Sequence, residues 1–576
     1  MEKAIEPRKD IFTLAVEIVS EFCRMNPKSP LFVRRASGLV REMSTTSASF
    51  YNIICSVGLA YGNAAIIMCS LPMFIVQIGA WAIPGYSVGM GIMFFMSLVL
   101  VAIYVCLVSA MPRTGGDYVF TTRISNPFIG WLEGWGLVWT VIGAIGTGVV
   151  LMGAAASSTV EIGVAVMGFS SWTPWVAWWS SLPGVSTMAI IVVVVILLQH
   201  LLPAKVYFRS FSILMVVAVV LMLLMTPLFV GATPARFEAA FQQFSGVTPA
   251  QLATQAATAG ASYVPFSLGS LGTVTAVALW IFIGFQYSIY FAGELKGNVA
   301  RNVIISVLAG LIVVAFVNSI LVNIYVGFLG WGGVYTNWAY LFWAGQAPLN
   351  GVWPLTPLLG AMLTPSWAIL GIISSCAMLL ATVLLCSAWT ALISRVVFAW
   401  SMDRVIPSWF ASINSRTKSP LRLIVLVCVA IFVLAVLTSL GANPTVAVWF
   451  TVIMGILTWF MPGFNAILLP SKRKDLFELA PSWARKKIGR VYLLPVLGVI
   501  WILFMIWDYG ISFVAPFVSA VTTAGLSGFA GYAISTGIAG VILTNVVGAA
   551  IWFASKWRNR KKGIEFKDIF ATLPPE

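Results

Sequence analysis

Charged residues are scarce in this sequence. Asp, Glu, Lys and Arg supply 9% of its 576 residues, 60% are hydrophobic, and the mean hydropathy is +0.97. Because a soluble domain carries roughly 25% charged residues, this composition excludes a large water-soluble protein. The apolar residues instead form many stretches of roughly 20 residues, each long enough to cross a hydrocarbon layer about 30 Å thick. We therefore expect one integral, polytopic protein of the lipid bilayer.

Side chains that serve metal, redox and acid-base chemistry are also few. The single histidine, His200, cannot form a metal cluster, and the seven cysteines include no Cys-x-x-Cys pair. Within the expected membrane spans only Glu133 and Asp508 are acidic, and they lie in different spans, whereas membrane-embedded acid-base chemistry needs convergent groups. The Gly-x-x-x-x-Gly-Lys-Ser/Thr motif of nucleotide-binding loops is absent. We expect no enzyme, no cofactor, no metal and no direct use of ATP.

The apolar segments divide the chain into about twelve expected membrane spans. Lipid offers no hydrogen-bond partner to exposed peptide groups, so each span is expected to be a helix and the fold to be all-α. The segment 157–184 is ambiguous, and counts of roughly eleven or thirteen are alternatives. The expected spans are 50–81, 86–110, 128–156, 185–202, 208–231, 271–293, 303–329, 365–393, 421–440, 446–469, 491–514 and 530–555.

Positive charge falls on one side of these spans. Lys and Arg accumulate in cytoplasmic loops, and with the N-terminus inside, all 33 Lys and Arg except Arg236 fall in cytoplasmic segments. The net charge of +15 is therefore a topology signal and does not indicate nucleic acid binding. Residues 1–45 lack the continuous apolar region of a cleavable signal peptide. We expect a multi-pass protein of the cell membrane with both termini cytoplasmic.

The expected organisation has a core between two cytoplasmic ends. An amphipathic helix on the membrane surface and a solvated helix are alternatives for the N-terminal segment. The parts are a cytoplasmic segment at 1–47, a core of spans 1–10 at 48–470, a basic loop with spans 11 and 12 at 471–556, and a cytoplasmic tail at 557–576.

Three cytoplasmic segments carry recognisable patterns. They read MPRTGGDYVFTTRISNPFIGWLEGW at 111–135, FIGFQYSIYFAGELKGNVARN at 282–302, and SRVVFAWSMDRVIPSWFASINSRTKSP at 394–420. In order, they resemble the loop after the second helix, the sixth helix with its following loop, and the loop after the eighth helix of amino acid permeases in the amino acid–polyamine–organocation (APC) superfamily. The sequence departs from that pattern at Met402-Asp403-Arg404, where the family has Arg-Asp-Gly.

The resemblance implies a leucine-transporter-type fold, in which spans 1–5 and 6–10 are inverted repeats, two helices follow, and spans 1 and 6 are interrupted. An interrupted helix frees backbone groups, and a half-helix N-terminus favours a carboxylate. Gly284 would let span 6 unwind, or alternatively only let two helices pack closely. The residues implied to bind substrate are Gly58, Tyr61, Gly62, Asn63 and Ala64 in span 1, and Phe282, Gly284, Phe285, Gln286, Tyr287 and Ser288 in span 6.

The resemblance further implies a secondary transporter, either symporter or antiporter, that works by alternating access. The stretches 58–66 and 282–288 contain no charged residue. A charged substrate side chain would need an opposite charge there, because an unpaired charge is costly at membrane depth. We therefore expect the substrate to be a neutral amino acid, with a polyamine or other amine as the alternative. A membrane-embedded enzyme and a channel are further alternatives; a channel would share the helices but would not need two interrupted ones.

The coupling ion, sodium or proton, is expected to depend on spans 5 and 8. Proton-dependent relatives place a Lys partway along span 5, whereas Lys205 and Arg209 lie at its entrance and 210–234 contains neither Lys nor Arg. The candidate sodium ligands on span 8 are Ser387 and, as alternates, Ser374 and Ser375. The alternative is that these serines bond their own helix. We expect sodium coupling or uncoupled exchange in preference to lysine-gated proton symport.

Charged residues of the cytoplasmic loops are candidates for an inward gate, with simple solvation as the alternative. These residues are Arg113, Asp117, Arg123, Glu294, Lys296 and Arg301.

Overall fold

The computed structural model describes residues 41–56, 75–78, 81–259, 261, 266–317, 327, 329, 333–343, 345–414, 417, 419–440, 450–451, 453–514 and 529–574. All five expected substrate-binding residues of span 1 lie outside the described residues: Gly58, Tyr61, Gly62, Asn63 and Ala64. The segment 1–40 lies outside them as well.

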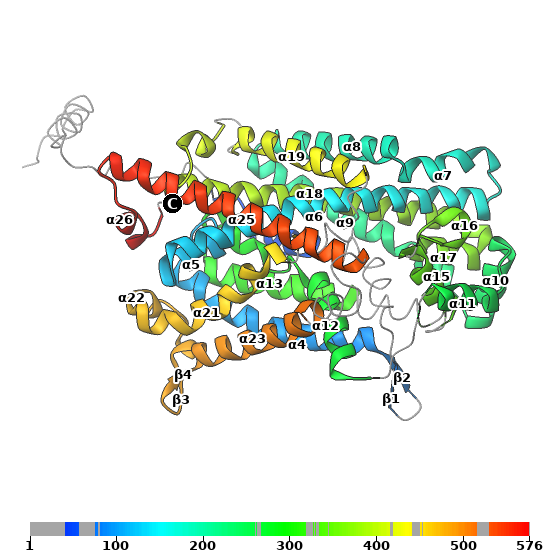
Figure 1. Cartoon of the computed structure of the whole chain (residues 1–576), viewed down its shortest axis with the longest axis horizontal. Helices are drawn as coiled ribbons and strands as arrows, with labels where there is room; N and C mark the ends of the chain where they lie inside the picture. Colours follow the sequence, from blue (N-terminus) through cyan, green and yellow to red (C-terminus); the bar gives the residue numbers. More distant parts are fainter. Residues whose placement is uncertain are drawn as a thin grey trace, which may run out of the picture.

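Long helices run side by side along the long axis of the molecule, and successive helices run in opposite directions (Figure 1). Each of them overlaps one of the expected spans. They are α2 (Thr45–Cys55), α4 (Gly85–Ala110), α6 (Pro127–Glu161), α8 (Leu182–His200), α9 (Ala204–Leu223), α12 (Leu268–Phe282), α13 (Val299–Ala315), α18 (Ala368–Met402), α19 (Leu421–Ser439), α21 (Ile456–Lys472), α23 (Leu493–Tyr509) and α25 (Phe529–Lys561).

The helices have the length and the surface expected in lipid. Within the described ranges, seven helices are long and apolar enough to cross a membrane, and α13 and α23 are shorter apolar helices. Large apolar side chains stand exposed along α8, α9, α19 and α23, among them Leu198, Val220, Val429 and Leu503. Exposed apolar surface of this extent is unfavourable in water and is satisfied by hydrocarbon. The chain is an all-α polytopic membrane protein.

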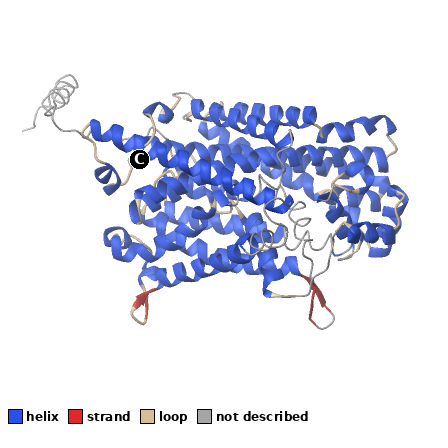
Figure 2. Cartoon of the chain, viewed as in Figure 1, coloured by secondary structure: helices blue, strands red, loops and turns tan. Residues whose placement is uncertain are grey.

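Short elements cover the two ends of the bundle, and Figure 2 shows that the strands of the described chain lie in two hairpins. At one end are α5 (Asp117–Ile124), η7 (Ser408–Ala411), α22 (Lys474–Phe477), η8 (Ser482–Arg485), β3 (Lys487–Ile488), β4 (Val491–Tyr492) and α26 (Phe566–Ala571). Towards the other end are β1 (Ile75–Ile78), β2 (Trp81–Pro84), η1 (Ile162–Val166), η2 (Ser170–Trp172), α7 (Thr173–Ser180), η3 (Thr226–Phe229), α10 (Pro234–Ser245), α11 (Pro249–Thr258), α15 (Val334–Trp343), α16 (Pro348–Gly351), α17 (Thr356–Leu363), η6 (Pro365–Trp367) and η9 (Gly510–Val514). The remaining short helix, η4 (Tyr287–Glu294), continues the path of α12.

Two expected boundaries are wrong. The first expected span, 50–81, ends in a strand, because β1 and β2 pair antiparallel with Ile75 opposite Pro84 and Ile78 opposite Trp81. The isoleucines of this segment are β-branched and favour a strand. The eighth expected span, 365–393, ends too early, since α18 continues to Met402 and the residues assigned to a loop from 394 onward begin as helix.

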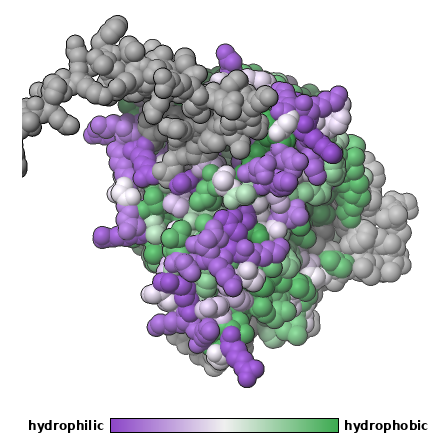
Figure 3. Space-filling model, turned by 90° about the vertical axis from the view of Figure 1, so that its left-hand side faces the viewer, coloured by the Kyte–Doolittle hydropathy of each residue, from purple (hydrophilic) through white to green (hydrophobic). Residues whose placement is uncertain are grey.

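The end that carries α5, α22 and α26 is strongly basic, and we call it the basic end. Nearly all described Lys and Arg lie here, in the ends of helices or in the segments that join them, whereas Arg236 lies in the first turn of α10 at the opposite end. Figure 3 views the basic end, where hydrophilic residues gather over the centre and hydrophobic residues flank them. The one-sided charge expected from the sequence is therefore a property of the folded molecule.

Candidate functional site

The helical path of the sixth expected span is interrupted at Gly284. The α-helix α12 stops at Phe282, and the chain resumes as a 3-10 helix at Tyr287. Gly284 has φ of +99°, and a side chain there would collide with the carbonyl of Cys55. Glycine is the residue that tolerates both this conformation and this close approach. The two explanations weighed for Gly284, unwinding and close packing, therefore both apply.

Side-chain hydrogen bonds connect the residues on both sides of this interruption, which spans 283–286, to the end of α2. The Ser288 backbone N–H donates to Asn52 Oδ1 at 2.7 Å, and Asn52 Nδ2 donates to Ser288 Oγ at 2.9 Å. Ser56 Oγ donates to the Ile281 carbonyl at 2.8 Å. These bonds satisfy backbone groups that the break in the helix would leave unpaired. Asn52 was not expected here, although a polar amide in an apolar helix is a signal of such contacts.

The helix α18 closes the same region from a third side. Trp389 Nε1 donates to the Cys55 carbonyl at 2.9 Å, and the Tyr51 hydroxyl donates to the Ala388 carbonyl at 2.6 Å. The rings of Trp389 and Tyr287 meet edge to face with centroids 6.4 Å apart. The end of α2, the interruption and the middle of α18 therefore form one connected unit. Trp389 was not among the expected site residues.

A cavity opens beside this unit. The cavity is lined by residues of the interruption, α6, α12, α18, α21 with the residues before it, and the end of α23. The lining is apolar and aromatic with a few hydroxyls. The lining residues are Thr140, Val141, Ala144, Ala276, Leu279, Ile283, Tyr287, Trp389, Thr451, Gly455, Trp459 and Tyr509. Among the expected substrate residues that the structure describes, Tyr287 lines it.

The other expected residues of span 6 are buried in packing around the cavity. Phe282 and Phe285 are buried, and Ser288 is bonded to Asn52 and lies 3.0 Å from Ser306 Oγ. Gln286 is buried, and its Oε1 has no hydrogen-bond partner within the described part of the chain. These residues shape the interruption, and the cavity wall is supplied largely by neighbours that the sequence did not single out.

The serines proposed for an ion are all buried on α18 but not at one place. Ser374 Oγ donates to the Leu221 carbonyl at 3.1 Å, whereas Ser387 lies beside the Tyr207 hydroxyl. Ser375 is the neighbour of Ser374 in sequence. At 1.5 Å per residue, Ser374 and Ser387 are roughly 20 Å apart along the helix. They cannot bind one ion together, so Ser387 and the Ser374–Ser375 pair are separate candidates.

Two buried ion pairs tie segments together at the basic end. Arg123 of α5 makes a two-pronged pair with Asp403, with Nη1–Oδ2 and Nη2–Oδ1 both 2.6 Å, and the Tyr118 hydroxyl donates to Asp403 Oδ2 at 2.8 Å. Arg395 of α18 pairs with Glu294 through Nε at 2.8 Å and Nη2 at 2.9 Å. Two of the expected gate residues, Arg123 and Glu294, thus have partners outside the expected set.

The remaining expected gate residues lie in different surroundings. Lys296 pairs with Glu42 at 2.8 Å on the surface, where the two side chains are 50% and 33% exposed. The backbone N–H of Arg301 donates to Asn298 Oδ1 at 3.0 Å and so helps to cap α13. Arg113 contacts the C-terminal segment at the Pro574 carbonyl.

Asp117 at the first residue of α5 accepts a hydrogen bond from the Tyr290 hydroxyl. Its neighbours Gly115 and Gly116 both have positive φ, and the ring of Tyr290 occupies the space that a side chain at 116 would need. Burial raises the pKa of Asp117 to about 7, although hydrogen bonds from Tyr290 and Tyr104 oppose this rise. A carboxyl of this pKa exchanges a proton near neutral pH.

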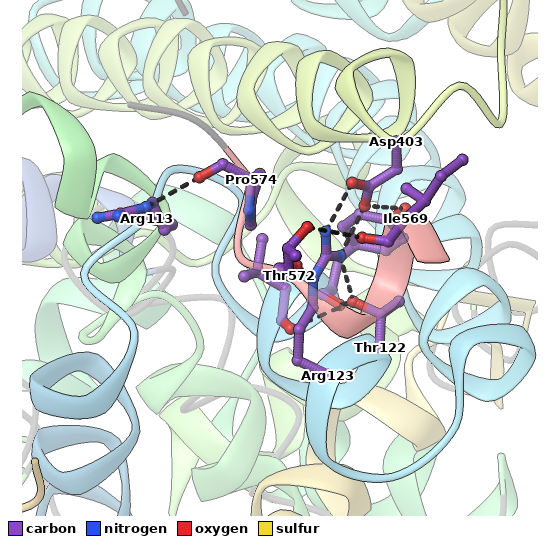
Figure 4. Close-up of polar contacts among 9 residues, drawn as sticks. Arg113, Thr122, Arg123, Asp403, Ile569, Thr572 and Pro574 are labelled. Atoms are coloured by element: carbon purple, nitrogen blue, oxygen red, sulfur yellow. Dashed lines mark hydrogen bonds and ion pairs between the residues drawn. The ribbon is translucent and has the colours of Figure 1, made fainter. Parts of the chain in front are cut away.

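The C-terminal segment lies against the arginines of the basic end (Figure 4). Arg123 Nε donates to the Thr572 carbonyl at 3.3 Å, and Arg113 Nε donates to the Pro574 carbonyl at 2.9 Å. The Arg123 guanidinium also stands over the Phe570 ring, 5.0 Å from its centroid. Phe570 in turn packs on Trp552 of α25. The last helix of the chain therefore contacts a residue of the buried ion pair.

Comparisons with known proteins agree with this architecture. The sequence profile of the family described as amino acid permease matches residues 42–553. An uncharacterized transporter of Rhizobium meliloti (strain 1021) is 24% identical over 233 residues, which are 40% of this chain and 43% of that protein. The matched part thus spans less than half the length of that relative. Because the family match covers most of the chain, this chain belongs to the amino acid permease family of the APC superfamily.

Proposed function

We propose that this protein moves neutral amino acids across the membrane by alternating access. The observation that supports this substrate class is the cavity beside Gly284, whose lining, among the described residues, contains hydroxyl, aromatic and apolar side chains and no charged residue. A charged substrate side chain would lie there without a counter-charge, which is costly at membrane depth. An apolar or aromatic side chain would contact Trp389 and Trp459 favourably.

The interruption supplies the polar part of the proposed site. Backbone groups around Gly284 can bind the amino and carboxylate groups of a substrate when they exchange their present partners. In this proposal Tyr287, Thr140 and Thr451 contribute hydroxyls from the cavity wall. The residues expected from span 1, Gly58, Tyr61, Gly62, Asn63 and Ala64, belong to the proposed site and lie outside the described residues.

The two buried ion pairs form the proposed inward gate. If the basic end is cytoplasmic, as the distribution of positive charge favours, then substrate release to the cytoplasm requires the segments joined by Arg123–Asp403 and Glu294–Arg395 to separate. Closure by paired charges is reversible, because each charge can be rehydrated when the gate opens. The coupling ion in this cycle is sodium, with Ser387 as a ligand, or a proton.

A small amine is the second candidate substrate. Tyr509 lines the cavity, and the preceding residue, Asp508, is buried with neither carboxylate oxygen hydrogen-bonded within the described part of the chain. A carboxylate in this position could receive an ammonium group if the end of α23 turned towards the cavity. The Asp508→Asn variant separates the candidates, because amine transport would be lost and neutral amino acid transport retained.

Uptake into proteoliposomes tests the proposal. Purified protein is reconstituted and supplied with labelled leucine or phenylalanine, and unlabelled leucine, phenylalanine, arginine, glutamate and putrescine are added as competitors. We expect the neutral amino acids to compete most strongly. Competition by arginine or glutamate as strong as that by leucine would contradict a neutral substrate, and absence of both uptake and binding for all amino acids and amines would refute the transport proposal.

A further inference from the structure

Two buried carboxylates near the basic end, Glu133 and Asp117, take no part in the two buried ion pairs Arg123–Asp403 and Glu294–Arg395. Glu133 of α6 is fully buried, and neither of its carboxylate oxygens is hydrogen-bonded within the described part of the chain, although the Thr121 side chain is near. Asp117 is 1% exposed and accepts a hydrogen bond from Tyr290. The two carboxylates are close enough to repel one another.

Among the described residues, the groups that face Asp117 and Glu133 are neutral. They are the hydroxyl side chains of Tyr104 on α4, Thr121 on α5, and Tyr287 and Tyr290 on η4. The buried arginines of the basic end are engaged elsewhere, Arg123 by Asp403 and Arg395 by Glu294. Two buried anions facing neutral groups are strongly unfavourable, so at least one cation is required beside them.

We propose that Asp117 and Glu133 form a proton-binding site of the transport cycle. This inference rests on the proposed function and names its coupling ion. A proton is the cation that a buried carboxyl group can hold without further ligands, because protonation removes the charge itself. The proton enters from water on one side, forms an O–H bond on one carboxylate, and returns to water on the other side. The site differs from a lysine of span 5, which the sequence argues against, and from the serines of α18.

The position of Tyr290 connects this site to the gate. Tyr290 lies on η4, between the interruption at Gly284 and the gate residue Glu294. Its hydroxyl donates to Asp117, and its carbonyl accepts from the Gly115 N–H at 3.1 Å. An ionised Asp117 accepts this hydrogen bond strongly, whereas a protonated one accepts it weakly. Proton binding therefore loosens η4, the same segment that carries one half of the Glu294–Arg395 pair.

Proton movement can be measured in proteoliposomes that contain a pH-sensitive dye. Addition of the neutral amino acid that the wild-type protein transports should acidify the lumen, and an inwardly directed proton gradient should raise uptake several-fold without sodium. The Glu133→Gln variant should lose both effects while retaining exchange of labelled for unlabelled amino acid, which shows that the protein is folded. Asp117→Asn should weaken the same two effects.

A matched control lies on the same helix. Glu161 is also buried on α6, but it accepts hydrogen bonds from Asn350 Nδ2 at 3.1 and 3.0 Å and lies towards the other end. Glu161→Gln should keep substrate-dependent acidification.

Three results would each overturn the proton site and leave the transport proposal intact. They are wild-type uptake without acidification, uptake driven by a sodium gradient and not by a proton gradient, and full acidification by Glu133→Gln. Absence of all uptake by the wild type would instead refute the transport proposal. If Glu133→Gln fails to fold, the wild-type measurement still decides.

Discussion

Arg123 and Asp403 lie 280 positions apart in the sequence and form a two-pronged ion pair whose side chains are 0% and 3% exposed. The pair joins α5 to the residue that directly follows α18, and each partner makes a further hydrogen bond, Asp403 with Tyr118 and Arg123 with Thr122. A buried pair of this kind contributes less net stability than its geometry suggests, because both charges lose their hydration. Substitution of only one partner is far more costly than loss of the whole pair, since the other partner then remains as an unpaired buried charge.

Breaking this pair should therefore show strong non-additivity. We expect Arg123→Ala and Asp403→Ala each to destabilise the protein by about 3–5 kcal/mol and to lower its melting temperature in detergent, and the double variant to be less damaged than the sum of the two. The surface pair Glu42–Lys296 provides the control, since Lys296→Ala should cost about 0–1 kcal/mol. Additive effects of Arg123→Ala and Asp403→Ala would contradict a buried, coupled pair.

Comparison of Gly284→Ala with Gly246→Ala should separate two effects of an added side chain, namely backbone strain at positive φ and collision with a neighbouring backbone. Gly246 has φ of +70° at the end of α10 with open space around it, so Gly246→Ala should cost about 1 kcal/mol from backbone strain alone. Gly284→Ala adds a collision with the Cys55 carbonyl to similar strain, and we expect loss of uptake together with a larger fall in melting temperature. Equal effects of the two variants would show that the close approach at Gly284 is unimportant.

The sequence indicated the class of protein and the place of the interruption more reliably than the site around it. Gly284 stands out in an apolar helix because few residues there permit a positive φ. The partners of the interruption could not be predicted, because Asn52, Ser306 and Trp389 reach it only through the packing of three helices. Similarly, Arg123 and Glu294 were recognisable as candidates, whereas their pairing with Asp403 and Arg395 is a tertiary contact that sequence spacing does not encode.

The hairpin of β1 and β2 shows the limit of hydropathy. An apolar run that continues from a helix is compatible with a span or with a short strand, because periodicity does not distinguish the two in a continuous apolar segment. The end of α18 shows the opposite error, since residues 394–420 were expected to be a loop from their resemblance to the family, whereas the helix continues to Met402. Arg395 can remain helical and buried because Glu294 forms an ion pair with it and its guanidinium lies over the Phe291 ring, 4.7 Å from the ring centroid.

Filling the cavity should reduce transport of large substrates first. Ala144 and Ala276 line the cavity, so Ala144→Leu and Ala276→Leu should lower phenylalanine uptake about tenfold or more, in line with the 1–3 kcal/mol cost of overpacking, and affect alanine uptake less. Ala155 lies on the same helix as Ala144 but does not line the cavity, and Ala155→Leu serves as the control. Unchanged phenylalanine uptake in both cavity variants would place the substrate elsewhere.

The raised pKa of Asp117 predicts a pH dependence of stability. The folded state holds a proton on this carboxyl up to about pH 7, whereas the unfolded chain releases it near the ordinary value of 3.8. Between these values the folded state binds more protons, so stability is greatest at low pH and falls as the pH rises towards 7, by an amount on the order of a few kcal/mol.

Melting temperatures measured in detergent from pH 5 to pH 8 test this dependence. The wild-type protein should melt at lower temperature as the pH rises, and Asp117→Asn should show a flatter profile. Asp475→Asn is the control, because the exposed Asp475 has its pKa lowered by the hydrogen bond from Arg473 and does not titrate in this range. A wild-type profile that is flat, or that rises with pH, would contradict the raised pKa.

The contacts of the C-terminal segment predict that it restrains the basic end. Phe570 packs between Arg123 and Trp552, so Phe570→Ala removes an aromatic face from the guanidinium and loosens the carbonyl contacts made by Thr572 and Pro574 (Figure 4). A cation over an aromatic ring contributes about 0.5–2 kcal/mol, so we expect the closed arrangement to be weakened by a similar amount and uptake to rise severalfold if opening of this end limits the rate. Removal of residues 564–576 should have the larger effect in the same direction.

Lys567→Ala is the control, because it lies on the same short helix as Phe570 and removes only an exposed ion pair with Glu565. It should leave uptake unaltered. Slower uptake by Phe570→Ala, with a melting temperature equal to that of the wild type, would mean that the segment assists transport and does not restrain it.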